Sequence, residues 1–146
     1  VPKETGSAWK QRVTMAAATQ QEILIVEDDP VIQGILSMNL TDEGYQVLTA
    51  GEGLVGVRLA TEAQPGLILM DMRLPDITGW EATQRLKTQP ETKHIPIIAL
   101  TAQSTSEDLR RCFDAGCDAF MTKPIQFSQL FTKIEMLLNR SDNALE

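Results

Sequence analysis

Acidic, hydroxyl and ammonium side chains follow short apolar runs at four places along the chain. In chain order they are the acids Glu27, Asp28 and Asp29, the acid Asp71, then Thr101 and Lys123. Carboxylates brought together repel one another unless a cation neutralises them, and hard oxygen ligands favour Mg²⁺. A carboxylate beside Mg²⁺ and a lysine can attack phosphorus, while an ammonium and a hydroxyl stabilise the phosphoryl oxygens. These residue types therefore indicate phosphoryl chemistry, provided that the fold brings them together.

The apolar runs themselves favour strands buried on both faces. They span Ile23–Val26, Leu67–Met70, Ile97–Leu100 and Ala119–Met121, and Tyr45–Thr49 indicates a further, less buried strand. Continuous rather than alternating apolarity is typical of parallel strands that are covered by helices.

Amphipathic helices are expected between these strands. The apolar faces lie within residues 31–40, 54–59, 79–87, 104–115 and 127–138. Ser104 with Glu107 fits a capping box at the start of the fourth helix, and Gly44 and Gly116 stand where C-terminal caps are expected. The pattern is five βα units, which predicts an α/β fold with a doubly wound parallel sheet. Ligands of such sheets bind beyond the carboxyl ends of the strands, where the polar groups should converge.

Four segments resemble the motifs of response-regulator receiver domains. They are ILIVEDDP (23–30), LILMDMRLPDITG (67–79), ALTA (99–102) and FMTKP (120–124), and they occur in the family's order and spacing. The resemblance covers about residues 22–139. It implies a five-stranded, flavodoxin-like sheet with strand order 2-1-3-4-5.

The resemblance also implies a role for each acid. Asp71 is expected to accept the phosphoryl group. Mg²⁺, or Mn²⁺, is expected to bind Asp28, Asp71 and the backbone carbonyl of Arg73 directly, and Glu27 through water. Asp29 is instead expected to cap a helix before Pro30.

The remaining roles concern the phosphoryl group and the switch. Thr101 is expected to donate a hydrogen bond to it and Lys123 to pair with it, with a cis peptide bond before Pro124. Phosphorylation would draw Thr101 inward and let Phe120 rotate, changing a face formed by the fourth helix, fifth strand and fifth helix (residues 104–115 and 125–138). Arg73 and Gln103 are expected to control water access and so the phosphate lifetime.

The resemblance further implies a signalling module of a two-component phosphorelay rather than an enzyme. The phosphoryl donor would be a histidine kinase or a histidine phosphotransfer protein. The net charge of −7 among 146 residues argues against direct nucleic-acid binding, and no apolar run is long enough for a membrane span. A cytoplasmic location is therefore expected.

The same residues leave other functions to consider. A phosphorylation-incompetent interaction module would keep the fold without the chemistry. A phosphatase with an Asp nucleophile would need a second acid two residues later, where Arg73 stands, and a flavin module would need a Ser/Gly-rich loop in place of the acids. The two cysteines and the single histidine are too few for a zinc site.

The chain divides into three segments. Residues 1–20 look like a linker, a tail or a remnant of cloning, residues 21–140 are expected to form the receiver domain, and residues 141–146 are expected to form a C-terminal tail. His94 is expected in a surface loop, Cys112 as a buried thiol and Trp80 as a partly packed side chain.

Overall fold

The computed structural model describes residues 21–102 and 105–145, with side chains up to residue 140. The expectations for residues 1–20, for Gln103 and for Ser104 lie outside the described residues.

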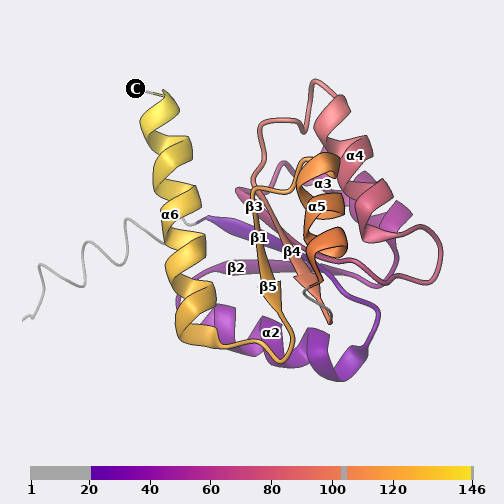
Figure 1. The fold of residues 1–146 in the computed structure, drawn as a ribbon. Coiled ribbons are helices and arrows are strands. Elements are labelled where there is room, and N and C mark those ends of the chain that lie inside the picture. Colours follow the sequence, from indigo (N-terminus) through magenta and orange to yellow (C-terminus); the bar gives the residue numbers. More distant parts are fainter. Residues whose placement is uncertain (1–20, 103–104, 146) are drawn as a thin grey trace, which may run out of the picture.

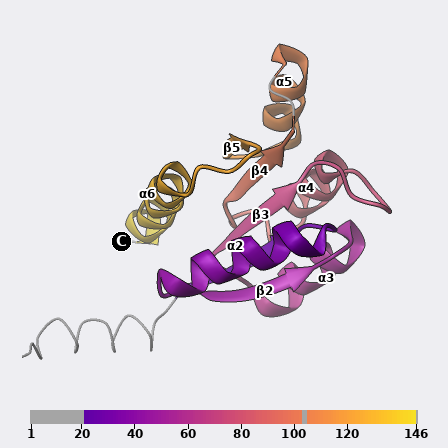
Figure 2. The ribbon, with the colours of Figure 1, turned by 90° about the horizontal axis from the view of Figure 1, so that it is seen from below.

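The described residues form alternating strands and helices. The strands are β1 (Glu22–Val26), β2 (Gln46–Ala50), β3 (Leu67–Asp71), β4 (Ile97–Thr101) and β5 (Ala119–Thr122), and the helices are α2 (Pro30–Asp42), α3 (Gly53–Ala63), α4 (Gly79–Thr88), α5 (Ser106–Ala115) and α6 (Phe127–Leu145). All strand pairs are parallel, and the order is β2-β1-β3-β4-β5. Figure 2 shows β2, β3, β4 and β5 following one another in this order. The predicted doubly wound α/β sheet and its strand order are confirmed.

Two apolar layers cover the sheet because successive strand residues point to opposite faces. Leu24, Val26, Ile68 and Met70 pack on one face with residues of α3, α4 and α5. The alternate strand residues pack on the other face with residues of α2 and α6. In Figure 1, α6 accordingly lies on one side of the strands and α3, α4 and α5 lie on the other. This double coverage explains why the apolar runs of the sequence are continuous.

Side-chain caps fix where α2 and α5 begin. Asp29 accepts hydrogen bonds from the backbone of Val31 and Ile32, with Pro30 following it, as expected. The cap of α5 is Thr105, whose hydroxyl accepts from the backbone N–H of Asp108, whereas the capping box predicted at Ser104 lies outside the described residues. The same spacing of a hydroxyl and an acid recurs one position later, and the structure uses that second pair.

Helix α6 runs to Leu145, so the tail expected from residue 141 continues this helix. The predicted boundary at residue 140 therefore falls within a helix, and the domain limits stay a prediction. Within the described part of the chain, no helix is both long and apolar enough to span a membrane.

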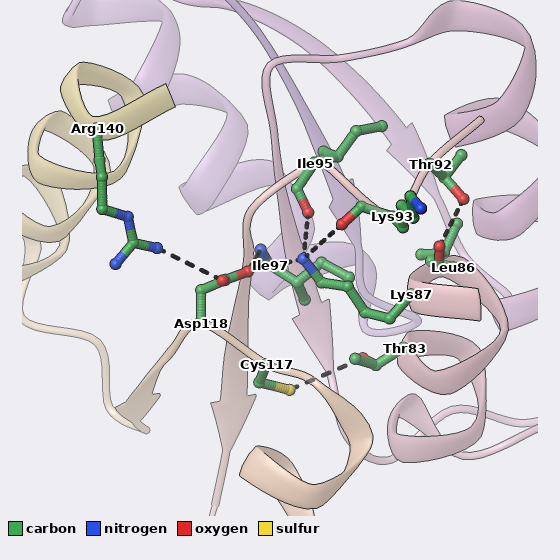
Figure 3. Close-up of polar contacts among 10 residues, drawn as sticks. All are labelled: Thr83, Leu86, Lys87, Thr92, Lys93, Ile95, Ile97, Cys117, Asp118 and Arg140. Carbon is green, nitrogen blue, oxygen red and sulfur yellow. Dashed lines mark hydrogen bonds and ion pairs between the residues drawn. The ribbon is translucent and has the colours of Figure 1, made fainter. Parts of the chain in front are cut away.

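An ion pair lies at the amino-terminal ends of β4 and β5 (Figure 3). Asp118 accepts from the Nζ of Lys87 at 3.0 Å and from the backbone N–H of Ile97 at 2.8 Å, and Arg140 of α6 lies 3.5 Å away. Lys87 also donates to the carbonyl of Ile95 at 2.8 Å. This cluster ties α4, β4, β5 and α6 together at the edge opposite the predicted site.

Candidate functional site

The carboxyl ends of four neighbouring strands bring the predicted residues together. Val26 of β1 pairs with Met70 of β3, so Glu27 and Asp71 come next to each other at the strand ends. Thr101 of β4 pairs with Thr122 of β5, so Lys123 follows directly beside it. The convergence expected from the sheet rule is therefore present.

Three carboxylates form the acidic part of the site. One oxygen each from Glu27, Asp28 and Asp71 lies within 4.8 Å of the others. Glu27 is 1% exposed and Asp71 is 4% exposed, whereas Asp28 is open to solvent. Asp29 does not belong to this group, because its carboxylate caps α2 as expected.

Lys123 lies between the two buried acids. Its Nζ donates to Glu27 Oε1 at 2.8 Å and lies 3.4 Å from Asp71 Oδ1. Burial raises the pKa of Glu27 above its usual range, with a further upward contribution from Asp71, although Lys123 partly opposes it. Burial would lower the pKa of Lys123, but its bond to Glu27 and the charge of Asp71 outweigh burial and raise it. The ammonium is thus held in its charged form beside the predicted phospho-acceptor.

The loop from β3 to α4 carries Arg73 and stays close to Asp71. The backbone N–H of Arg73 donates to Asp71 Oδ1 at 3.3 Å, and the N–H of Gly79 donates to the carbonyl of Met72 at 2.9 Å. A side chain at residue 79 would meet the carbonyl oxygen of Asp71, so only glycine fits there. The Arg73 backbone is therefore held in a short closed loop beside the acids.

Thr101 and Phe120 occupy the positions predicted for the switch. Thr101 is 5% exposed at the end of β4, and its carbonyl accepts from the N–H of Lys123 at 2.8 Å. Phe120 is half-buried and stacks edge-on against Phe113 of α5, with 6.2 Å between ring centroids. The ring thus lies between β5 and α5. The cis peptide bond between Lys123 and Pro124 is confirmed.

The donor set suits a hard divalent cation. The acids supply carboxylate oxygens alone, and the partly buried ammonium of Lys123 offsets only part of their charge. Mg²⁺ typically takes one or two carboxylates and keeps several waters, so the site offers enough carboxylates without all three acids binding the ion directly. The three acids of this group include the predicted ligands Asp28 and Asp71, while the Arg73 carbonyl as a direct ligand and Glu27 as a ligand through water stay predictions.

Outside the site, the single histidine, the cysteines and Trp80 also lie in described parts of the structure. His94 is exposed in the turn before β4, and Cys112 is a buried free thiol, both as predicted. Burial raises the pKa of the Cys117 thiol to about 12, which makes it unreactive. Trp80 is partly buried as predicted, and Arg111 of α5 stacks on its ring 3.7 Å from the centroid.

The sequence analysis predicts no role for Asp76, but the structure gives it one. Its two carboxylate oxygens accept from the backbone N–H groups of Gly53 and Leu54, each at 2.8 Å. Desolvation raises the pKa of this exposed carboxyl group, but the hydrogen bonds from Leu54 and Gly53 outweigh it and lower the pKa of Asp76. No local signal in the sequence could have identified the pair, because the partners are more than 20 residues away along the chain.

Comparisons with known proteins agree with this layout. Residues 23–135 match the family described as the response regulator receiver domain. The chain is 36% identical over 118 residues to the polar-differentiation response regulator DivK of Brucella anthropi, covering 81% of this chain and 96% of that one. It is 39% identical over 120 residues to the DNA-binding dual master transcriptional regulator RpaA of Synechocystis, covering 82% of this chain. It spans only 50% of RpaA's length.

Solved structures with the same fold include two informative neighbours. The receiver domain of the Pseudomonas aeruginosa sensor histidine kinase PA1611 has a TM-score of 0.78 and 36% identity, with 82% of this chain and 98% of that chain covered. That structure holds a magnesium ion in its active-site cleft. A CheY-like receiver protein from Methanospirillum hungatei has a TM-score of 0.80 and 28% identity, with 86% and 98% covered. With its motifs gathered at one sheet edge and this likeness along most of its length, the chain belongs to the response regulator receiver domain family of two-component signalling.

Proposed function

We propose that this receiver domain accepts a phosphoryl group on Asp71 from a phosphohistidine, with Mg²⁺ or Mn²⁺ bound beside it. The observation that carries the proposal is a nearly buried carboxylate that meets two further carboxylates within 4.8 Å and an ammonium at 3.4 Å. A role as a signalling module rather than an enzyme acting on small molecules follows, since residue 73 is an arginine where an Asp-nucleophile phosphatase needs its second acid.

Each side chain has a part in this transfer. A carboxylate oxygen of Asp71 would form a bond to phosphorus while the bond from phosphorus to the donor's imidazole nitrogen breaks, and that nitrogen takes a proton. Lys123 would neutralise charge on one phosphoryl oxygen, and the Thr101 hydroxyl would donate to another. Asp28, Asp71 and the Arg73 carbonyl would hold the metal, whose contribution is to balance the charge of the acids and the phosphoryl oxygens.

Intact mass after incubation with acetyl phosphate tests this proposal. A single phosphoryl adduct should form with Mg²⁺ and should be lost with excess EDTA. No adduct, together with no metal binding, would favour the phosphorylation-incompetent interaction module. Steady hydrolysis of small phosphate esters at many turnovers would favour the phosphatase instead.

An apolar groove beside Lys123 suits the approach of the phosphoryl donor. The groove has a volume of about 540 Å³, and its lining is Ile32, Ile35, Leu36, Lys123, Pro124, Ile125 and Phe127. Lys123 also contacts Asp71, so a protein seated in this groove would be next to the acceptor. We infer that the donor's contact surface is apolar and includes this groove.

Replacing Ile35 by Asp should slow transfer from a phosphohistidine protein by about 10-fold or more, because a charge would enter an apolar contact. Phosphorylation by acetyl phosphate, which needs no docking, should stay within about twofold of wild type. Ile35 is 44% exposed, so the fold should tolerate the change. Met136→Asp, at a 63% exposed position of α6, is the matched control and should not slow transfer. Equal slowing with both donors would contradict the docking role.

The output face is proposed to include α5, β5 and α6 around Phe120. The ring already packs against Phe113 of α5, so a rotation toward the site would alter the surface that both rings form. Phe120 has no hydroxyl, so packing alone would have to favour an inward state.

Phe120→Ala should therefore uncouple phosphorylation from partner binding. We expect the adduct to form at close to the wild-type rate, while the gain in affinity for a downstream partner on phosphorylation falls by about 5-fold or more. Binding measured with and without phosphorylation gives this ratio. A variant whose binding depends on phosphate as strongly as wild type would show that Phe120 is not the switch.

Two further features stay predictions. A cytoplasmic location rests on the sequence, and the downstream partner is proposed to be a protein rather than nucleic acid because of the net charge of −7.

A further inference from the structure

The first turn of α3 is capped by a side chain from the metal-site loop. Glu52, the residue at the N-cap position, makes no side-chain capping bond. Asp76 supplies it, with Oδ1 accepting from the N–H of Gly53 and Oδ2 from that of Leu54, each at 2.8 Å. Both oxygens of one carboxylate are therefore committed to the α3 backbone.

A second contact joins the same two segments. A Cβ on Gly53 would come 2.6 Å from Cγ1 of Ile77, so the loop packs tightly on the first residue of α3. Ile77 also packs against the apolar layer under α3 and α4. The far side of the loop is thus fixed by an apolar contact and two hydrogen bonds.

Arg73 lies between two anchors of this loop. The Gly79 N–H to Met72 carbonyl bond closes the loop at its base, and Asp76 ties its outer part to α3. Loss of the two Asp76 hydrogen bonds would leave the outer part of the loop held to α3 by the Ile77 contact alone. Mg²⁺ requires nearly ideal octahedral geometry, so small displacements of a backbone ligand weaken its binding.

We propose that Asp76 is a positioning residue that sets the place of the Arg73 carbonyl and so the affinity for the divalent metal. The inference rests on the proposed function, because it takes that carbonyl as a metal ligand. Asp76 acts through the loop and α3, and it contacts neither the metal nor the phosphoryl group.

Binding of Mn²⁺, followed by the electron paramagnetic resonance signal of the free ion, tests the inference directly. Asp76→Ala should weaken Mn²⁺ binding about 3- to 10-fold, below the 10–100-fold typical when a direct partner of a ligand is lost. Asp76→Asn keeps one acceptor oxygen and should lie between Ala and wild type. Hydrogen exchange of the Gly53 and Leu54 amides should quicken in Asp76→Ala.

Asp118→Ala is the matched control. Asp118 also accepts a backbone N–H and joins distant segments, but at the opposite edge of the sheet (Figure 3). Asp118→Ala should lower the unfolding midpoint. The Mn²⁺ affinity of the folded molecules should stay unchanged.

Two results would overturn the inference. One is a wild-type Mn²⁺ affinity in Asp76→Ala despite faster exchange at Gly53 and Leu54, which would make the cap purely structural. The other is equal weakening by Asp118→Ala, which would reflect general destabilisation. Either result, with the wild-type adduct on Asp71 intact, leaves the proposed function standing, whereas a wild-type chain that takes no adduct overturns that function itself.

Discussion

Replacing Asp71 by Asn should reduce the acetyl-phosphate adduct to less than about 1% of wild type, because the amide is no nucleophile. Asp71 is 4% exposed, and Asn has nearly the same shape, so the side chain should remain in place. The substitution also removes one of three neighbouring carboxylates, which relieves repulsion and offsets the lost contact with Lys123. We therefore expect the unfolding free energy to change by no more than about 1 kcal/mol.

The sequence offers a matched control for this substitution at Asp29. Asp29 lies next to the acidic cluster, but its carboxylate caps α2, a role that Asn fills equally well. Asp29→Asn should keep both the adduct and the stability. An adduct that persists in Asp71→Asn would place the acceptor elsewhere, and peptide mapping of the modified residue would then identify it.

The fold could be predicted because its signals are local. Each buried strand is a short apolar run, and each run ends in the polar residue that the sheet rule places at the site. The convergence of Glu27, Asp71 and Lys123 follows from strand order alone, so the acidic cluster and the nearby ammonium were accessible from the sequence.

The features that could not be predicted from the sequence depend on the exact residue at which a helix begins or ends, or on partners far away along the chain. Ser104 with Glu107 and Thr105 with Asp108 have the same spacing, so only the structure shows that Thr105 is the cap. The cap that Asp76 provides for α3 joins segments whose distance apart is set by the packing of Ile77. Apolar periodicity stops at Leu138, but no Gly or Pro follows, and α6 continues to Leu145.

The second large effect is expected at Lys123, whose role differs from that of the acceptor. Lys123→Ala should slow phosphorylation by about 100-fold or more, since it removes a charge that is already placed beside Asp71. Mn²⁺ binding should remain or strengthen, because the acidic cluster loses its internal cation. Slow phosphorylation with intact metal binding would distinguish the role of Lys123 from that of Asp28. Loss of Asp28 should weaken metal binding and phosphorylation together.

The same substitution should make stability depend on pH in a defined direction. Glu27 is 1% exposed and already has a raised pKa through burial, which Lys123 partly opposes. Removing the ammonium raises that pKa further and leaves the buried carboxylate without its charged partner, although the backbone N–H of Asp29 still donates to it, at a cost of about 1–3 kcal/mol near neutral pH. A carboxyl group with a raised pKa binds more protons in the folded than in the unfolded state, so stability falls as pH rises from 4.5 through the folded-state pKa.

Unfolding of metal-free Lys123→Ala at about pH 5 and about pH 7.5 should therefore show a larger loss of stability on raising the pH than wild type shows. Lys123→Arg keeps the positive charge and should restore the wild-type pH dependence, but its planar fork should recover only part of the phosphorylation rate. If Ala and Arg variants lost the same rate and shared one pH dependence, the charge of Lys123 would not be what matters. The pairing of Glu27 with Lys123 would then serve packing alone, and the stabilisation of the phosphoryl group would fall to Thr101 and the metal.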